Sequence, residues 1–424
     1  MSIIENDLIE KGSKARLASK KLAKLSSNTK NEALFKIAYN LENQCEEIIK
    51  VNLKDIAVGK EKGLTEALLD RLLLTQTRIF GMANDLRNIV NIPDPIGGIL
   101  DQRILPNGLN VSRRRVPLGV IGAIYESRPN VTIDISALCL KSGNAVILRG
   151  GSEAIYSNKK LSDIVRQSIA EIGIPIDSVC FIDSPDRSVV DQMLSMKNYI
   201  DLLIPRGGAD LIRYVGNNAT MPVITGGIGV CHTYIDKSAD LCKSVAISYN
   251  AKVQRPTVCN AMDTLIIHSA VASSHLTAIA KKWSEAGVEM HCDNKSMDIL
   301  GSIKGLKLKA ADDDDWGTEF LSLVVSVRVV DSFQEALDHI DMYGSGHSEA
   351  IVTQDYSNAM TFLDDVDAAA VFVNASTRFT DGAEFGLGAE VAISTNKLHA
   401  RGPMGLNELT SYKWTVLGDG QVRD

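Results

Sequence analysis

One cysteine of the chain stands where a nucleophile could be held rigidly. Cys259 follows the proline-containing turn 254–258 and precedes the strand-like apolar segment 263–268. The thiolate is the strongest nucleophile among the side chains at neutral pH, and a thioester formed on it keeps a carbonyl that hydride can reduce. Most free cysteines are small buried apolar residues, so the rest of the chain must support a catalytic interpretation.

Two turns combine an arginine with a pair of glycines. They are Arg149-Gly-Gly-Ser-Glu153 and Pro205-Arg-Gly-Gly-Ala-Asp210. The glycines let the backbone approach a ligand closely, and the arginine supplies a fixed positive charge. Neither turn matches the Gly-x-Gly-x-x-Gly fingerprint, and each pair alone is equally compatible with ordinary turn structure. Two such turns in one sheet favour a bound ligand.

A third turn, Tyr125-Glu-Ser-Arg-Pro-Asn130, places Ser127 and Arg128 at a predicted helix entrance. Pro129 suits the first turn of a helix. A helix N-terminus directs free N–H groups and partial positive charge at any anion bound there.

These turns lie in a stretch where short apolar runs alternate with helical patterns. The predicted strands are 116–124, 145–148, 179–182 and 200–204, and the predicted helices are 131–140, 154–172, 188–196 and 210–215. This alternation indicates a parallel sheet buried on both faces. Ligands of such sheets bind at the carboxyl ends of the strands, which is where all three turns fall.

A second α/β region is expected after residue 224. It contains Cys259, a strand over 320–330 that Glu319 opens, a helix near 334–342 and a strand over 368–374. Helices are predicted for residues 1–92, because apolar residues recur there at three- and four-residue steps. Asn107-Gly108 predicts a hairpin, and residues 409–417 a closing strand. A hairpin without a core of its own is a candidate arm that reaches a neighbouring subunit, so we expect a homo-oligomer.

Composition excludes several classes of function. The chain has 424 residues, of which 45% are apolar, and a net charge of −7 without a basic face. We therefore expect no nucleic-acid or membrane partner. The seven cysteines are scattered without Cys-x-x-Cys pairs, which favours reduced thiols over disulfides or a metal site. The N-terminus shows no signal or transit peptide, so a cytoplasmic location is expected.

Several segments together resemble the aldehyde dehydrogenase superfamily over nearly the full length. The resemblance implies two parallel-sheet α/β domains, one Rossmann-like for the cofactor and one catalytic, plus a small β oligomerisation arm. We expect the cofactor domain at 1–100 and 116–227, the catalytic domain at 228–405, and the arm at 101–115 and 406–424. The segments that carry the resemblance are 116–130, 140–151, Gln254-Arg-Pro-Thr-Val-Cys259 and Gly344-Ser-Gly-His-Ser-Glu-Ala350.

The resemblance also implies catalytic roles. Cys259 matches the nucleophile, and Ser127 stands where many members have an asparagine that holds the oxyanion. Thr225 stands where hydrolytic members have a glutamate that activates water, so hydrolysis of a thioester should be slow. This departure favours reduction of an acyl group over release of an acid.

The implied cofactor is NADP(H). Arg149 matches a lysine that reaches the adenosine ribose, and Ser152 replaces a glutamate that binds the 2′-hydroxyl in NAD-preferring members. A serine beside an arginine accepts a 2′-phosphate that a carboxylate would repel. Gly207 and Gly208 match the turn over the pyrophosphate, and Glu319 matches the residue that binds the nicotinamide ribose.

Within the superfamily, the chain is similar to the branch that reduces L-glutamyl 5-phosphate to L-glutamate 5-semialdehyde in proline biosynthesis. Arg128, Arg255, His232 and His347 are candidate substrate ligands, with structural ion pairs or buried histidines as the alternatives. Because the acyl phosphate is labile, contact with glutamate 5-kinase is a further hypothesis. The alternatives to this activity are another acyl reductase or aldehyde oxidiser on the same scaffold, and a catalytically silent nucleotide-binding scaffold.

Overall fold

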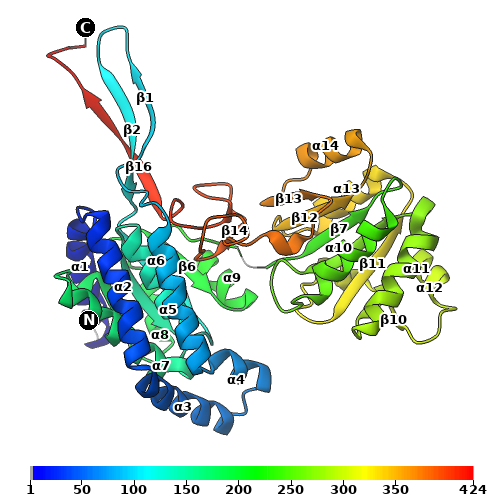
Figure 1. Cartoon of the computed structure of the whole chain (residues 1–424), viewed down its shortest axis with the longest axis horizontal. Helices are drawn as coiled ribbons and strands as arrows, with labels where there is room; N and C mark the ends of the chain where they lie inside the picture. Colours follow the sequence, from blue (N-terminus) through cyan, green and yellow to red (C-terminus); the bar gives the residue numbers. More distant parts are fainter. Residues whose placement is uncertain (1–2, 227, 424) are drawn as a thin grey trace. The chain divides into compact units, whose positions relative to one another are not determined.

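The computed structural model describes residues 3–226 and 228–423, which form two compact units. Unit 1 comprises Met1–Thr225, Gly386–Ala392 and Met404–Asp424, and unit 2 comprises Gly226–Phe385 and Ile393–Pro403 (Figure 1). The first change of unit, after residue 225, falls close to the expected boundary at 227. Segment 386–392 lies in unit 1, although the sequence had placed it with Cys259. Gly388 packs so closely on Ile92 that a Cβ there would lie 2.5 Å from Ile92 Cδ1.

Unit 1 is built on a four-stranded parallel sheet in the order β5-β4-β3-β6. Strands β3 and β4 are buried along their whole length, as their continuous apolar sequences predict. The alternation of strand and helix predicted for residues 116–215 is confirmed. The elements are α1 (Ile3–Leu22), α2 (Ser27–Asn43), α3 (Cys45–Glu61), α4 (Glu66–Leu72), α5 (Gln76–Asn91), β3 (Val120–Tyr125), α6 (Asn130–Lys141), β4 (Ala145–Gly150), η1 (Ser152–Ala154), α7 (Ile155–Glu171), η2 (Ile176–Ser178), β5 (Val179–Phe181), α8 (Ser188–Leu194), β6 (Leu202–Arg206) and α9 (Ala209–Asn218).

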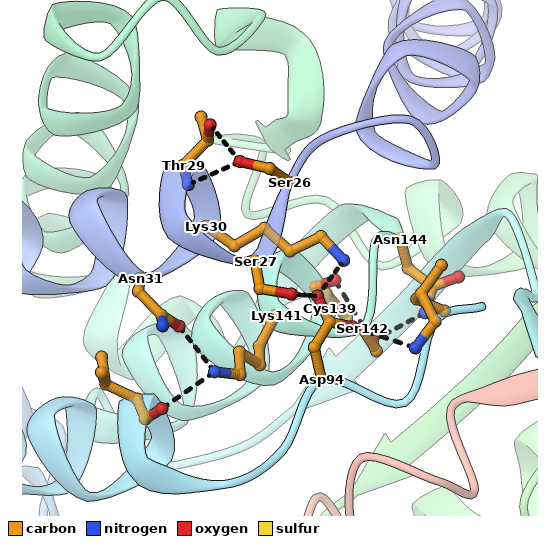
Figure 2. Close-up of polar contacts among 12 residues, drawn as sticks. Ser26, Ser27, Thr29, Lys30, Asn31, Asp94, Cys139, Lys141, Ser142 and Asn144 are labelled. Carbon is orange, nitrogen blue, oxygen red and sulfur yellow. Dashed lines mark hydrogen bonds and ion pairs between the residues drawn. The ribbon is translucent and has the colours of Figure 1, made fainter. Parts of the chain in front are cut away.

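Buried charges fix the N-terminal helices to this unit (Figure 2). Lys30 of α2 pairs with Asp94 at 2.9 Å, and the two side chains are only 1% and 8% exposed. Asp94 also accepts the Ser27 hydroxyl at 2.9 Å. Lys141, at the end of α6, donates to Asn31 Oδ1 at 2.6 Å and to the carbonyl of Val90 at 3.0 Å. Each ammonium therefore ties two elements of the unit together.

The predicted hairpin and closing strand form a separate antiparallel sheet in unit 1, in the order β1-β2-β16 (Figure 1). Asn107-Gly108 makes the turn, and Gly108 has a φ of 86°, which favours glycine. Within this sheet, Arg113 stacks on Tyr412 at 5.0 Å and pairs with Asp101. The strands of this sheet, hereafter the arm, are β1 (Ile99–Ile104), β2 (Asn110–Pro117) and β16 (Thr410–Leu417).

Unit 2 is built on a seven-stranded parallel sheet in the order β10-β9-β11-β8-β7-β12-β13. Trp283 of α11 and Phe362 of α14 belong to two separate apolar cores, to which alternate residues of the strands contribute. The elements are β7 (Cys231–Ile235), α10 (Leu241–Val253), β8 (Met262–His268), α11 (Ser269–Glu285), β9 (Glu289–Cys292), α12 (Asn294–Leu300), β10 (Lys307–Ala310), η3 (Asp313–Gly317), β11 (Val324–Val330), α13 (Phe333–Tyr343), β12 (Ser348–Val352), α14 (Tyr356–Asp365), β13 (Ala370–Val373), η4 (Thr377–Phe379), β14 (Ile393–Ser394) and β15 (Gly402–Pro403).

One strand of unit 2 begins later than its sequence predicts. Strand β11 starts at Val324, so Glu319 lies in the preceding loop and does not open the strand. Leu321 has a φ of 48°, a left-handed conformation that cannot continue an extended strand. Within residues 3–226 and 228–423, no helix has the length and apolar character needed to cross a membrane.

Candidate active site

The sheet of unit 1 brings the three predicted turns to one edge. Tyr125, the last residue of β3, lies opposite Gly150 of β4 and Arg206 of β6. The turns that carry Ser127, Ser152 and Gly207 therefore leave adjacent strands side by side. This is the carboxyl edge of a parallel sheet, where ligands of such folds bind.

Arg149 has the properties of a residue that binds an anionic group. It lies near the end of β4, is 8% exposed, and its Nε has no hydrogen-bond partner among the described residues. Burial lowers the pKa of Arg149, because the charged guanidinium loses hydration. A buried donor without an acceptor is costly, so an anionic group here would be favoured. Ser152, two residues after β4 ends, is exposed at the same edge.

Two carboxylates at this edge were missed by sequence reasoning. Glu126 accepts the N–H of Gly208 at 3.0 Å, and Glu153 accepts the N–H of Ser127 at 2.6 Å and its hydroxyl at 3.0 Å. The glycines make room for them, since a Cβ on Gly207 would lie 2.4 Å from Glu126 Oε2. An acidic residue next to each candidate turn was the only sequence signal.

The bond to Glu153 bears on the expected role of Ser127. Ser127 has a φ of 45°, a conformation rare outside glycine. Its backbone N–H and hydroxyl both point to one carboxylate oxygen, which holds this strained residue in place. The hydroxyl has a single proton to donate, so it must leave Glu153 before it can stabilise an oxyanion.

In unit 2, Cys259 lies in the turn between the end of α10 and the start of β8. Its carbonyl oxygen accepts the thiol of Cys231 at 3.2 Å. Gly229 packs directly on that carbonyl, and its N–H donates to Glu319 Oε1 at 3.0 Å. The structure therefore brings Cys259 and Glu319 together through Gly229.

A buried ion pair supports the same loops. Lys252 of α10 lies 3.3 Å from Asp263 of β8, and both side chains are almost completely buried. Asp263 also accepts the N–H of Phe320 at 3.1 Å, which fixes the loop that carries Glu319. Burial, together with the charge of Asp263, raises the pKa of Glu319.

Both candidate histidines are completely buried. His232 Nδ1 lies 3.0 Å from Glu349 Oε2 on the neighbouring strand β12. His347 Nδ1 lies 2.8 Å from the Ser348 hydroxyl, and burial lowers the pKa of His347 to about 4. These placements favour the structural alternative over contact with a substrate.

The arginines near the two catalytic turns differ in their surroundings. Arg128 and Arg255 are exposed, and Arg255 forms no ion pair with any described residue. Sequence reasoning missed Arg378, which is half-buried and donates from Nε to Gln254 Oε1 at 2.8 Å. Burial and the charge of Arg255 lower the pKa of Arg378, and a thiolate at Cys259 opposes that shift. Through Gln254, Arg378 is bonded to the turn that precedes Cys259.

No group of three or more His, Cys, Asp or Glu side chains within the described ranges is arranged to hold a metal ion. The described residues instead place the candidate nucleophile Cys259 in unit 2 and the candidate anion site around Arg149 in unit 1.

Comparison with known proteins identifies the class. Residues 4–302 match the model of the aldehyde dehydrogenase family, which covers most of the chain, so the protein belongs to that family. The γ-glutamyl phosphate reductase of Dehalococcoides mccartyi is 56% identical over 99% of this chain and 100% of that protein. The enzyme of the same name from Clostridium tetani is 51% identical over 100% of both chains. The crystal structure of γ-glutamyl phosphate reductase from Thermotoga maritima is 46% identical, covers 98% of this chain and 100% of that one, and has a TM-score of 0.96. Within the family, the chain is thus a member of the γ-glutamyl phosphate reductases.

Proposed function

We propose that the protein reduces L-glutamyl 5-phosphate to L-glutamate 5-semialdehyde and phosphate with NADPH. Membership of the γ-glutamyl phosphate reductases supports the reaction and its place in proline biosynthesis. The observation that carries the chemistry is Cys259, held in a turn on which Gly229 packs and linked through Gly229 to Glu319.

In the proposed reaction the Cys259 thiolate attacks the acyl carbonyl of the substrate. A carbon–sulfur bond forms, the bond from carbon to the phosphate oxygen breaks, and phosphate leaves with the electron pair. A reduced nicotinamide cofactor, when bound, would supply the hydride that reduces the resulting thioester. The thiohemiacetal then loses the thiolate, which gives the aldehyde and restores Cys259.

Two features of the chain support retention of the acyl group until it is reduced. Thr225 cannot act as a general base, so it does not activate water against the thioester. Arg255, exposed and without an ion pair among the described residues, is a candidate to receive the leaving phosphate. Arg128, at the entrance of α6, is the second candidate.

Members of the aldehyde dehydrogenase family use nicotinamide cofactors. The edge of the unit 1 sheet fits such a group, because the buried Arg149 Nε has no acceptor among the described residues. We propose that Arg149 and Ser152 hold the 2′-phosphate of NADP(H), that Gly207 and Gly208 lie against the pyrophosphate, and that Glu319 binds the nicotinamide ribose. Ser127, once released from Glu153, is the proposed oxyanion donor.

Substitution of the nucleophile tests the mechanism. Cys259→Ser should abolish the NADP⁺- and phosphate-dependent oxidation of L-glutamate 5-semialdehyde, while Cys242→Ser, at an exposed cysteine, should retain it. Full turnover by Cys259→Ser would refute the mechanism. Oxidation of simple aldehydes without phosphate would favour an aldehyde oxidiser instead. A Cys259 that resists thiol reagents with and without NADPH would favour the silent scaffold.

The arm supports a proposal about assembly. Ile104, Trp414 and Leu417 are 74%, 51% and 70% exposed, and apolar side chains at that exposure are suited to a second copy of the chain. We propose a homo-oligomer formed through the arm, which sedimentation of the Trp414→Glu variant would test. Contact with glutamate 5-kinase is a further proposal, and separate elution of the two proteins at physiological salt would count against it.

A further inference from the structure

A small cavity of unit 2 opens beside the turn that carries Cys259. Its volume is about 180 Å³, and it combines one cation with two carboxylates and two amides. Its lining residues are Asn250, Gln254, Arg378, Phe379, Asp381 and Glu384.

The cation of this cavity, Arg378, makes no direct ion pair with a described residue, although the charge of Asp381 acts on it. Arg378 is half-buried, and in the described part of the chain it forms no ion pair. Its Nε is held by Gln254 Oε1 at 2.8 Å, which leaves the terminal guanidinium nitrogens for another acceptor. A partly desolvated guanidinium without a carboxylate partner favours an anionic ligand.

The carboxylates of the cavity are placed separately from Arg378. Asp381 Oδ1 accepts the N–H of Ala383 at 2.9 Å, so its second oxygen remains available. Glu384 is exposed and forms no ion pair with described residues. Because no acid here lies within 4.0 Å of the guanidinium, a ligand with both a carboxylate and an ammonium could bridge the two.

The mixed charge of the cavity distinguishes between the two anionic groups of the proposed substrate, its phosphate and its α-carboxylate. A phosphate dianion would be attracted by Arg378 but repelled by Asp381 and Glu384. A zwitterionic amino-acid head satisfies both signs, with its carboxylate on Arg378 and its ammonium on the acids.

Hydrogen bonds also connect the segment that lines the cavity to the residue next to Cys259. Asn260, which follows Cys259, donates from its side-chain amide to the carbonyl of Thr380 at 2.9 Å. Thr377 donates its hydroxyl to the carbonyl of Asn260 at 2.7 Å. The segment that carries Arg378 is therefore bonded on both sides to the residue next to the thiol.

From this arrangement we infer that the cavity binds the α-carboxylate and α-ammonium groups of the substrate, with Arg378 on the carboxylate and Asp381 and Glu384 on the ammonium. The inference rests on the proposed function for the identity of the substrate, and it makes Arg378 the residue that determines specificity for an amino acid. It also assigns the two ends of the substrate to different arginines of unit 2, the α-carboxylate to Arg378 and the phosphate to Arg255.

The test compares three aldehydes in the presence of NADP⁺ and phosphate: L-glutamate 5-semialdehyde, 5-oxopentanoate, which lacks the amino group, and butanal, which lacks both groups. Arg378→Gln should lower kcat/KM for the semialdehyde about 100-fold, because a charge-assisted pair is lost, and should lower it much less for butanal, which has no carboxylate for Arg378 to bind. Asp381→Asn combined with Glu384→Gln should lower the semialdehyde about tenfold and leave 5-oxopentanoate unchanged. Arg71→Gln, on the exposed surface of α4, is the matched control.

Several outcomes would overturn the inference. An equal loss with butanal would place Arg378 at the thiol, and a raised KM for phosphate would place it at the leaving group. If the wild-type protein oxidises butanal but not the semialdehyde, the proposed function fails. The amino-acid site is then tested on its own, by asking whether L-glutamate inhibits the oxidation of butanal. Inhibition that Arg378→Gln abolishes supports the amino-acid site, and absence of inhibition in the wild type refutes it.

Discussion

Replacement of Gly229 by alanine adds a single methyl group, and we expect this small change to lower turnover strongly. A Cβ at this residue would lie 1.5 Å from the carbonyl oxygen of Cys259 and 2.4 Å from its carbonyl carbon. Real Cβ contacts do not fall below 3.0 Å, so the two segments must separate by about 1.5 Å in Gly229→Ala. The N–H of Gly229 also holds Glu319, so both Cys259 and Glu319 move relative to their surroundings.

A displacement of this size should reduce turnover more than it reduces stability. Misplacement of reacting groups by about 1 Å costs on the order of 100-fold in rate. Overpacking costs about 1–3 kcal/mol of unfolding free energy, which a chain of this size tolerates. We therefore expect kcat for oxidation of L-glutamate 5-semialdehyde to fall at least about 100-fold, with a folded protein by circular dichroism.

The control is Gly81→Ala in α5, where an added Cβ would meet nothing within 4 Å. This variant should keep wild-type turnover and gain about 0.5–1 kcal/mol in unfolding free energy, since alanine favours the helix. Thiol labelling of Gly229→Ala would locate the defect at Cys259. Wild-type turnover by Gly229→Ala would refute the tight packing of this glycine on the nucleophile turn, and the argument that the turn must be rigid.

Three further predictions concern stability and the cofactor. Asp94→Asn should lower the unfolding free energy by about 3 kcal/mol in chemical denaturation, because it leaves the buried Lys30 charge without its partner. Asp70→Asn, which breaks an exposed pair with Arg78, should lower it by less than about 1 kcal/mol. Equal effects of the two substitutions would contradict the argument from burial. The pKa of His347 is lowered to about 4, so the folded state binds fewer protons than the unfolded state between pH 4 and 6.5, and stability should fall as pH falls through that window. His347→Gln should remove up to about 3 kcal/mol of that dependence in unfolding curves at pH 7 and pH 4.5, and an unchanged slope would refute the assignment. Arg149→Gln should weaken NADPH binding at least about tenfold and NADH binding much less in fluorescence titrations, and equal losses would argue against a 2′-phosphate site.

Much of the fold could be predicted because its signals are local. Continuous apolar runs separated by helical patterns gave the sheet of unit 1, and Asn107-Gly108 gave the hairpin of the arm. The start of β11 could not be predicted, because the apolar sequence continues through residues 320–323 while the left-handed Leu321 interrupts the strand. The preceding residue, Phe320, donates its N–H to Asp263, a partner far away in the sequence.

The site was predictable only where a residue type is itself unusual. A cysteine after a proline turn and two Arg-Gly-Gly turns stand out in any sequence, so Cys259 and Arg149 could be proposed from the sequence alone. Glu126, Glu153 and Arg378 are ordinary charged residues whose meaning depends on partners that the fold supplies. Arg378 lies more than 100 residues after Cys259, and no local pattern connects the two.

The carboxylates at the candidate turns suggest how the site remains ordered without ligands. Glu126 holds the N–H of Gly208, Glu153 holds that of Ser127, and Glu319 holds that of Gly229. In each case an acidic side chain satisfies a backbone donor that would otherwise be unpaired in a turn. Donors fixed in this way need little reorganisation when a ligand group replaces the carboxylate, and electrostatic preorganisation of this kind accounts for much of enzymatic rate enhancement. The same exchange would return Glu126 and Glu153 to solvent, so ligand binding at the edge of the unit 1 sheet should be coupled to movement of these two carboxylates.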